Sequence, residues 1–172
     1  IVETIGISGD YWSALQDRAA RLGVEMVHVG QRVRHSRGTT DDGRKAWSLW
    51  DSYVFADFVT YPSLWEGWGN QFIEAVFARL PVLVFEYPVW KTDLAPAGFE
   101  VISLGDRITG HDERRLAFMD PRTIQRAADE IVAVLCDAER RRRMVEHNFE
   151  AGRRHFSFDV LERHIRELTA GV

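Results

Sequence analysis

Short apolar runs alternate with amphipathic stretches along most of this chain. Runs rich in β-branched residues predict strands, and apolar residues spaced three or four apart predict helices. By this pattern, strands are expected at residues 4–8, 24–29, 58–61, 82–85 and 101–104. Helices are expected at residues 10–22, 46–55, 70–78, 121–135, 138–153 and 158–168. Such alternation is typical of an α/β domain with a Rossmann-like, largely parallel sheet and helices on both faces.

Cap and turn residues mark the ends of several expected elements. Asp10 is expected to cap the first helix and Gly23 to end it, while Asp120 precedes a helix that starts at Pro121. Residues 35–45 are polar and rich in turn formers, which indicates a loop. The helices after Asp120 either pack on this domain or reach a part of the protein outside the chain, and the pattern leaves both open.

Composition narrows the class of partner. The chain has 172 residues, enough for one well-buried domain, and its net charge of −4 argues against a nucleic-acid partner. The basic run at residues 140–143 fits a solvated helix face. The six histidines show no metal-ligand spacing, so no metal site is predicted. No apolar run is long enough for a transmembrane segment and no signal peptide is visible, so a cytoplasmic location is expected.

A few apolar residues are assigned to the core from their place in the helical pattern. Cys136, the one cysteine, is expected to be a buried and inert thiol. Trp47 and Trp50 are expected to face the core. The chain opens at Ile1 almost directly into a strand-like run, so we interpret residues 1–172 as an N-terminally truncated piece of a longer protein.

The segment with the most unusual composition is residues 61–75, YPSLWEGWGNQFIEA. A predicted strand ends at Tyr61, a loop with two glycines follows, and a helix is expected from Asn70. Glu66 lies in the loop, and Glu74 lies about one turn into the helix. Glycines let backbone amides approach a ligand closely. The unpaired amides at a helix start favour an anion, so this segment predicts a phosphate site with a carboxylate on either side.

The two carboxylates need a different partner, because they would repel phosphate. Hydroxyl groups of a sugar or a ribose can donate hydrogen bonds to a carboxylate, each worth about 1.5–3 kcal/mol when partly buried. Four loop residues span at most about 13 Å and five helical residues rise about 7 Å, which places the helix N-terminus between the carboxylates. A nucleoside diphosphate sugar has this layout. Spacing alone also allows Glu74 to be an ordinary surface residue of the helix.

The same segment resembles the signature of a large family of retaining glycosyltransferases, which includes bacterial mannosyl- and glucosyltransferases and sucrose synthases. The matching positions are Pro62-Ser63, Glu66-Gly67-Trp68-Gly69, Glu74-Ala75, Ala78 and Pro81-Val82. Weaker matches extend over nearly the whole chain, at residues 6–10, 22–24, 29–30 and 156–157. The resemblance implies the C-terminal, nucleotide-sugar-binding domain of a two-lobed GT-B glycosyltransferase of the group 1 (family 4) type.

The resemblance also implies a role for each residue of the signature. Glu66 would be the catalytic carboxylate, in contact with hydroxyls of the transferred hexose near the reacting carbon, and Glu74 would hold the donor ribose. The backbone amides that line the sugar and the pyrophosphate would come from Gly67, Trp68, Gly69, Asn70 and Gln71. Residues 30–33 would lie near the base. No cofactor is required, and Mg²⁺ on the phosphates is not indicated.

A second partner implied by the resemblance is an N-terminal, acceptor-binding domain outside this chain, without which the fragment is expected to be inactive. The family carries an Arg and a Lys near the first strand of this domain, and that strand either lies upstream of Ile1 or is lacking. The loop cations that could approach phosphate are Arg44, Lys45 and Lys91, although a solvated loop position fits each of them better.

Two further features near the signature bear on specificity. The loop at residues 86–93, EYPVWKTD, lacks the glycines common in the family and is expected to shape sugar or acceptor specificity. Trp65 and Trp68 flank Glu66 and are the candidate aromatic platforms for a sugar.

Two other functions remain alternatives at this point. A nucleotide-sugar epimerase or phosphorylase could use the same scaffold, but the paired Glu66 and Glu74 argue against it. A non-catalytic α/β binding module, such as a response-regulator-like domain, would want an acidic cluster after the first strand, where Asp10 stands alone. Binding of a nucleoside diphosphate would separate a transferase from such a module.

Overall fold

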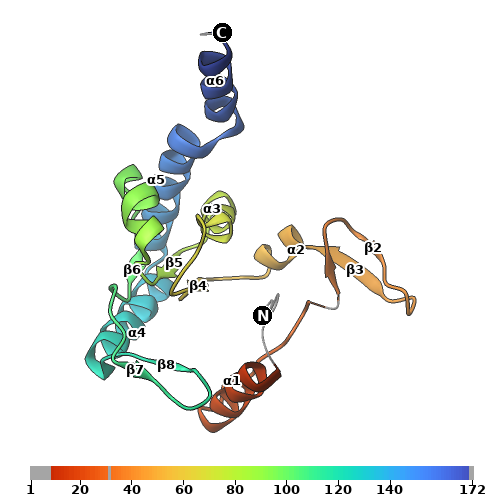
Figure 1. The fold of residues 1–172 in the computed structure, drawn as a ribbon, viewed down its shortest axis with the longest axis vertical. Coiled ribbons are helices and arrows are strands. Elements are labelled where there is room, and N and C mark those ends of the chain that lie inside the picture. Colours follow the sequence, from red (N-terminus) through yellow and green to blue (C-terminus); the bar gives the residue numbers. More distant parts are fainter. Residues whose placement is uncertain (1–8, 31, 171–172) are drawn as a thin grey trace. The chain divides into compact units, whose positions relative to one another are not determined.

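The computed structural model describes residues 9–30 and 32–170 (Figure 1). The expected strand at residues 4–8 and part of the expected base-binding region, Gln31, lie outside the described residues. The chain forms two compact units. One consists of residues 1–55 and 107–120, and the other of residues 56–106 and 121–172.

The second unit is built on a parallel three-stranded sheet in the order β4-β5-β6. Its strands are β4 (Val59–Tyr61), β5 (Val82–Val84) and β6 (Ile102–Ser103). They confirm the strands expected at these places, each shortened at one or both ends. β5 lies in the middle, which explains its uninterrupted apolar sequence, because both faces of a central parallel strand are covered.

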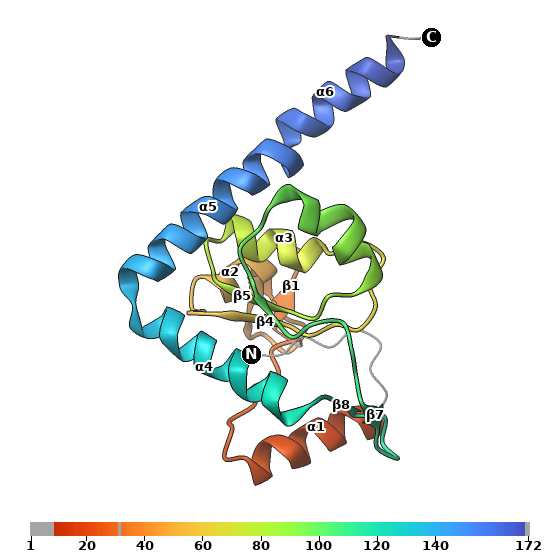
Figure 2. The ribbon, with the colours of Figure 1, turned by 90° about the vertical axis from the view of Figure 1, so that its left-hand side faces the viewer.

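Four helices belong to this unit: α3 (Asn70–Phe77), α4 (Pro121–Cys136), α5 (Ala138–Phe156) and α6 (Phe158–Thr169). Figure 2 shows α3 on one side of β4 and β5 and α4 on the other. Between β5 and β6 the chain forms a π-helical turn, η1 (Trp90–Leu94), and a 3₁₀ turn, η2 (Ala95–Ala97). The unit therefore has the Rossmann-like α/β fold expected from the sequence, with a parallel sheet flanked by helices.

The core of this unit lies on both faces of β5. Leu83 packs with Ile102, Ala127, Val134 and Met144, which come from β6, α4 and α5. Side chains alternate along a strand, so the neighbours of Leu83 face the side that α3 covers. On that side the ring of Phe72 lies 4.6 Å from Trp90 and 5.0 Å from Phe99, centroid to centroid. These contacts fix α3, and with it the loop that precedes α3, against the sheet.

A buried asparagine joins α5 to the segment that leads into β6. Asn148 is 1% exposed. Its amide nitrogen donates to the carbonyl of Glu100 at 2.7 Å, and its amide oxygen accepts from the Glu100 N–H at 2.8 Å. The Asn148 side chain thus forms the pair of hydrogen bonds that a neighbouring strand would form with Glu100. No buried polar atom of Asn148 is left unpaired.

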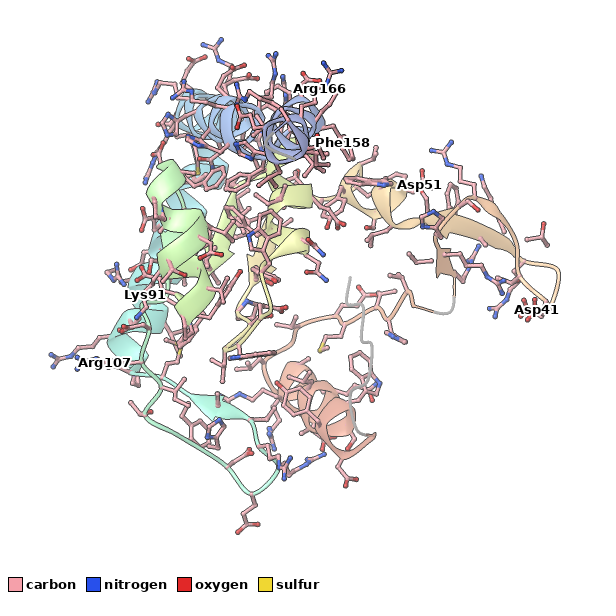
Figure 3. The ribbon with its side chains drawn as sticks, turned by 45° about the horizontal axis from the view of Figure 1, so that its top comes forward. Asp41, Asp51, Lys91, Arg107, Phe158 and Arg166 are labelled. Carbon is pink, nitrogen blue, oxygen red and sulfur yellow. The ribbon has the colours of Figure 1, made fainter. Side chains whose placement is uncertain are left out.

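The last helix, α6, has no buried residue. Its apolar side chains Phe158, Leu161, Ile165 and Leu168 are all exposed, and Figure 3 shows Phe158 at the surface of the helix. The sequence left open where the C-terminal helices pack. α4 and α5 pack on the sheet of this unit, as Met144 and Ala127 show, whereas α6 does not.

The first unit contains α1 (Gly9–Arg21), β1 (Val33–Arg34), β2 (Gly38–Thr39), β3 (Lys45–Ser48), α2 (Leu49–Tyr53), β7 (Gly110–His111) and β8 (Ala117–Phe118). β3 pairs with β1 in parallel and with β2 antiparallel. The turn between β2 and β3 carries Asp41 at its tip (Figure 3). Arg114, in the hairpin of β7 and β8, donates to Asp17 and to Ser13 of α1, each at 2.7 Å.

Several expectations for the first unit are wrong. Residues 24–29 form no strand, and residues 35–45 are not only a loop, because they hold β2. The helix expected at residues 46–55 begins only at Leu49, since Ala46 pairs with Gly38 inside the small sheet. A short apolar window fits a strand and a helix equally well, and the pairing of strands decides between them.

Residue assignments are corrected at three further places. Asp10 lies inside the first turn of α1 rather than capping it, while Gly23 ends that helix with φ +68°, as expected. Trp50 is 54% exposed and not part of the core. Cys136 is exposed at the end of α4 rather than buried. Trp50 and Cys136 both lie on helices that carry more apolar residues than the side facing the core can bury.

Candidate functional site

The candidate site is the connection from β4 to α3, at the carboxyl end of the parallel sheet. β4 ends at Tyr61, residues 62–69 form the loop, and α3 begins at Asn70. In open α/β sheets ligands bind beyond the carboxyl ends of the strands. The fold therefore places the whole glutamate–glycine signature at the expected binding edge.

Gly69 makes the turn from the loop into α3. Its φ of +142° and ψ of +45° are a backbone conformation that side chains rarely adopt. A Cβ at this position would lie 2.4 Å from the hydroxyl oxygen of Tyr87 and 2.8 Å from Cδ1 of Leu94. Only glycine fits this position, because a side chain would strain the backbone and its Cβ would overlap Tyr87 and Leu94.

The N-terminus of α3 has no side-chain cap. Its first intrahelical bond runs from the Ile73 N–H to the Gly69 carbonyl at 3.2 Å. The amides of Asn70, Gln71 and Phe72 precede that bond, so they have no partner within the helix. Together with the helix dipole they form a site that favours an anion.

Glu66 lies in the loop before this helix and is half-buried. Its negative charge raises the pKa of two nearby phenols, those of Tyr61 and Tyr87. The Tyr61 hydroxyl donates to Oε1 of Gln71 at 3.4 Å. The Tyr87 hydroxyl donates to the carbonyl of Trp68 at 2.7 Å. Three residues predicted from the sequence, Glu66, Trp68 and Gln71, therefore lie near the two tyrosines.

Both tyrosines keep their protons over the physiological range. Burial raises the pKa of Tyr61, and electrostatic interactions with the phenol of Tyr87 and with the negative charge of Glu66 raise that pKa further. Burial, with a smaller contribution from the negative charge of Glu66, raises the pKa of Tyr87 to about 12. Each phenol is therefore available as a neutral hydrogen-bond donor. The sequence analysis missed both residues, since only the register of β4 and β5 brings them together.

Glu74 lies in the second turn of α3 and is half-buried. The buried residues of this helix are Phe72, Ile73, Ala75 and Val76. With 3.6 residues per turn, Glu74 falls on the opposite side, which it shares with Asn70. Glu66 thus precedes the uncapped amides and Glu74 follows them, in the order along the chain that the sequence predicted.

The two candidate sugar platforms differ. Trp65 is 76% exposed and free of the core. Trp68 is half-buried, and its ring meets Phe156 of α5 edge to face at 5.4 Å between centroids. The indole of Trp68 is therefore engaged in packing, and its backbone remains the part that faces the candidate site. Trp65 is the better candidate for stacking.

The loop after β5 is tied to the end of β6. Ser103 donates its hydroxyl to the Glu86 carboxylate, and the Glu86 N–H donates to the Gly105 carbonyl at 2.9 Å. Lys91 pairs with Asp106 at 2.9 Å. Arg44 pairs with Asp42 in the first unit. These two candidate phosphate cations thus already have carboxylate partners.

The first unit holds a separate pocket of about 280 Å³. It is lined by Val29, Arg32, Val33, Trp47, Asp51, Ser52 and Phe55. The charged groups among these residues are engaged: Arg32 donates twice to the Lys45 carbonyl at 3.2 Å, and Asp51 accepts from Arg37 and Ser48. The surface left for a ligand is consequently apolar.

Neither a cluster of metal ligands nor a membrane-spanning helix is present among the described residues. Within residues 9–30 and 32–170, no group of three or more His, Cys, Asp or Glu side chains is placed to hold a metal ion. Over the same residues, no helix has both the length and the apolar character needed to cross a membrane.

The fold is that of an α/β domain whose candidate site lies at the carboxyl end of its parallel sheet. The chain is similar to two curated proteins, both named mannosylglucosylglycerate synthase. It is 42% identical to the one from Thermotoga maritima over 153 residues, which are 89% of this chain and 33% of that protein. It is 40% identical to the one from Petrotoga mobilis over 150 residues, 86% of this chain and 33% of that protein.

The chain thus spans about a third of the length of the curated relatives it matches. No protein-family model matches it. No solved structure matches it. Neither relative is named as an epimerase, a phosphorylase or a non-catalytic module.

Proposed function

We propose that this chain is the nucleotide-sugar-binding domain of a retaining glycosyltransferase of GT-B architecture. The full-length protein would transfer a hexosyl group from a nucleoside diphosphate sugar to an acceptor held by a second domain. The observation that carries the proposal is the uncapped N-terminus of α3, which follows Glu66 and precedes Glu74 at the carboxyl end of the sheet. The names of the relatives support it, because a mannosylglucosylglycerate contains sugar units that have to be joined.

The diphosphate, the ribose and the hexose of the donor each have a proposed place within the second unit. The diphosphate binds the amides from Gly67 to Gln71, where a helix start favours negative charge. The ribose diol donates to Glu74, and hydroxyls of the hexose donate to Glu66. A carboxylate accepts several hydrogen bonds and so suits a pair of neighbouring hydroxyls. Trp65, which is exposed beside Glu66, offers an apolar face to the sugar ring.

Catalysis in this proposal rests on positioning and electrostatics. The reaction needs a donor carbon held in attack geometry and a departing diphosphate whose charge is stabilised. Glu66 would orient the hexose, and the start of α3 would stabilise the diphosphate. No covalent nucleophile is required. Cations that complete the phosphate site would come from elsewhere in the protein, since Lys91 is paired with Asp106.

The test distinguishes the roles of Glu66 and Glu74 in the full-length protein. Calorimetry with uridine, guanosine and adenosine diphosphates first identifies the base. Glu74→Gln should then weaken binding of that diphosphate by about 1–3 kcal/mol, because a charge-assisted bond to the ribose becomes neutral. Glu66→Ala should leave this affinity almost unchanged or slightly raised, but lower turnover by about 100-fold or more.

The matched control is Glu150→Gln, which neutralises an exposed carboxylate on α5 whose pairing with Arg153 is loose, at 3.6 Å. It should change neither affinity nor turnover. If Glu66→Ala and Glu74→Gln weakened diphosphate binding equally and left turnover intact, the proposed division of roles would be wrong. If none of the three diphosphates bound the wild-type protein, the donor-binding proposal itself would fail.

A further inference from the structure

Tyr87 is a fully buried tyrosine that lies just beyond the end of β5, in the segment that leads to η1. The main chain holds it on both sides. The Tyr87 N–H donates to the Phe85 carbonyl at 2.9 Å, and the Lys91 N–H donates to the Tyr87 carbonyl at 3.2 Å. The ring meets that of Tyr61 edge to face, with the centroids 6.1 Å apart. The hydroxyl of Tyr87 therefore extends from a fixed backbone and a packed ring.

The residue before Tyr87 is anchored to the end of β6 by three hydrogen bonds that close into a ring. The Glu86 N–H donates to the Gly105 carbonyl at 2.9 Å, and the Gly105 N–H donates to the Ser103 hydroxyl oxygen at 2.8 Å. The Ser103 hydroxyl donates in turn to the Glu86 carboxylate. Two neighbouring strands thus hold the segment that carries Tyr87. A side chain that is locked in this way can hold a second group in place.

The group that Tyr87 holds is a peptide of the loop before α3. The Tyr87 hydroxyl donates to the carbonyl of Trp68 at 2.7 Å. That carbonyl belongs to the peptide that joins Trp68 to Gly69, and this peptide is trans. A trans peptide is planar, and its C=O and N–H point in opposite directions. The bond from Tyr87 therefore fixes the plane of the peptide and directs the Gly69 N–H away from the buried phenol.

Gly69 connects this contact to the start of α3. A Cβ at Gly69 would overlap the Tyr87 hydroxyl oxygen, so the phenol occupies the space that a side chain would need. Gly69 is also the N-cap of α3, and its φ of +142° and ψ of +45° set the direction in which the helix begins. The hydrogen bond to the Trp68 carbonyl therefore acts on the residue from which the uncapped amides of α3 follow.

We propose that Tyr87 is a positioning residue for the diphosphate of the donor. It orients the peptide between Trp68 and Gly69 so that the Gly69 N–H joins the first amides of α3 as a phosphate donor before the ligand binds. The inference rests on the proposed function, which assigns the anion at the start of α3 to a nucleoside diphosphate. A donor that is already oriented loses little freedom on binding, and its bond to a phosphate oxygen therefore adds more to the affinity.

A merely structural role for Tyr87 makes a different prediction. Loss of a buried hydrogen bond would then lower the melting temperature of the protein and leave its affinity for phosphate groups unchanged. The discriminating quantity is the loss of affinity for a nucleoside diphosphate, compared with the loss for the same nucleoside without phosphates. Tyr87→Phe removes only the hydroxyl oxygen, so the ring keeps its packing against Tyr61.

The experiment uses the full-length protein, with calorimetry for the nucleoside diphosphate and inhibition of turnover for the corresponding nucleoside. Tyr87→Phe should raise the Kd for the diphosphate about tenfold, as expected for one hydrogen bond to a charged group. The inhibition constant of the nucleoside should stay unchanged. Asn148→Ala is the matched control, because it removes a buried pair of hydrogen bonds in the same unit that does not involve the loop. It should lower Tm and leave both constants unchanged.

Thermal unfolding shows that each variant has folded. An unchanged Kd for the diphosphate in Tyr87→Phe would overturn the inference. Equal losses for the diphosphate and the nucleoside would also overturn it, as would an equal loss of diphosphate affinity in Asn148→Ala, because the effect would then be a general loosening of the fold. In these cases the losses expected for Glu66→Ala and Glu74→Gln leave the proposed function standing. If the wild-type protein binds no nucleoside diphosphate, the proposed function and the inference fail together.

Discussion

Gly69 is the residue on which the geometry of the candidate site depends most directly. Its φ of +142° would strain the backbone of any residue that has a side chain. Tyr87 and Leu94 occupy the space where a Cβ would lie. Backbone strain of this kind costs about 1–3 kcal/mol. An alanine would also push the Tyr87 hydroxyl away from the Trp68 carbonyl, which lies 2.7 Å from it in the native structure.

We therefore expect Gly69→Ala to lower the free energy of unfolding by about 2–4 kcal/mol, the sum of strain and a lost buried hydrogen bond. Urea unfolding at neutral pH measures it. Gly67→Ala is the matched control, because nothing lies within 4 Å of a Cβ there and its φ is ordinary. Equal stability losses in the two variants would mean that Gly69 is not held as tightly as its surroundings indicate.

At this scale, the sequence predicts roles for Glu66, Gly69 and Glu74, because the chemistry of a glycine or a carboxylate follows from the residue type and its spacing. It did not find Tyr61 or Tyr87. Their joint position depends on the pairing of Tyr61 with Val84 in the sheet, which no local pattern reports. The prediction that Cys136 is buried was wrong for a related reason. Cys136 is the last residue of α4, and the end of a helix can extend beyond the core that its middle packs against.

At the scale of elements, the apolar strands of the sheet were predictable and the small strands were not. β5 has an uninterrupted apolar sequence because both of its faces are covered. β2 and β3 are short, and polar contacts of neighbouring residues such as Arg37 and Thr40 stabilise this region. The Arg37 guanidinium binds the buried Asp51 carboxylate with two nitrogens, and Ser48 adds its N–H and its hydroxyl. Long-range polar pairs of this kind leave no periodic signal.

The pair of Arg37 and Asp51 makes the stability of this region depend on pH. The hydrogen bond from Arg37 holds the pKa of Asp51 well below its usual range. A lowered folded pKa means that the contribution is fully present above the unfolded value, about 4, and is lost as pH falls toward the folded value. The folded protein should therefore lose stability below about pH 4, as Asp51 takes up its proton.

Arg37→Gln should reduce this loss, because the carboxylate then keeps a pKa nearer to that of the unfolded chain. Urea unfolding of both proteins between neutral pH and pH 3 measures the difference. Arg34→Gln is the control, since its partner Asp41 is 98% exposed and lies 3.5 Å away. If Arg37→Gln left the loss of stability at acid pH unchanged, that loss would come from other carboxylates.

At the scale of the whole molecule, the chain comprises two compact units and a helix without a buried face. The curated relatives are about three times as long as the matched region. Phe158, Leu161, Ile165 and Leu168 form an exposed apolar stripe on α6. The sequence could predict α6 but not the exposure of its apolar side chains, because an amphipathic pattern shows which face is apolar and not what covers that face.

The proposed function makes a prediction for the 172-residue chain on its own. We expect it to fold, because the sheet of the second unit is covered on both faces by its own helices. We expect no sugar transfer, because the acceptor and the remaining phosphate contacts would belong to the rest of the protein. A radiolabelled donor assay on the purified chain, run beside the full-length protein, measures this. Cooperative thermal unfolding shows that the chain has folded.

A control variant distinguishes true transfer from contamination. Any activity of a contaminating enzyme would be the same in preparations of the wild-type chain and of its Glu66→Ala variant. Transfer by the wild-type chain at the full-length rate, abolished by Glu66→Ala, would show that these residues alone hold both donor and acceptor. In that case the second lobe would be dispensable. A folded chain without transfer, beside an active full-length protein, is the result that a donor-binding domain requires.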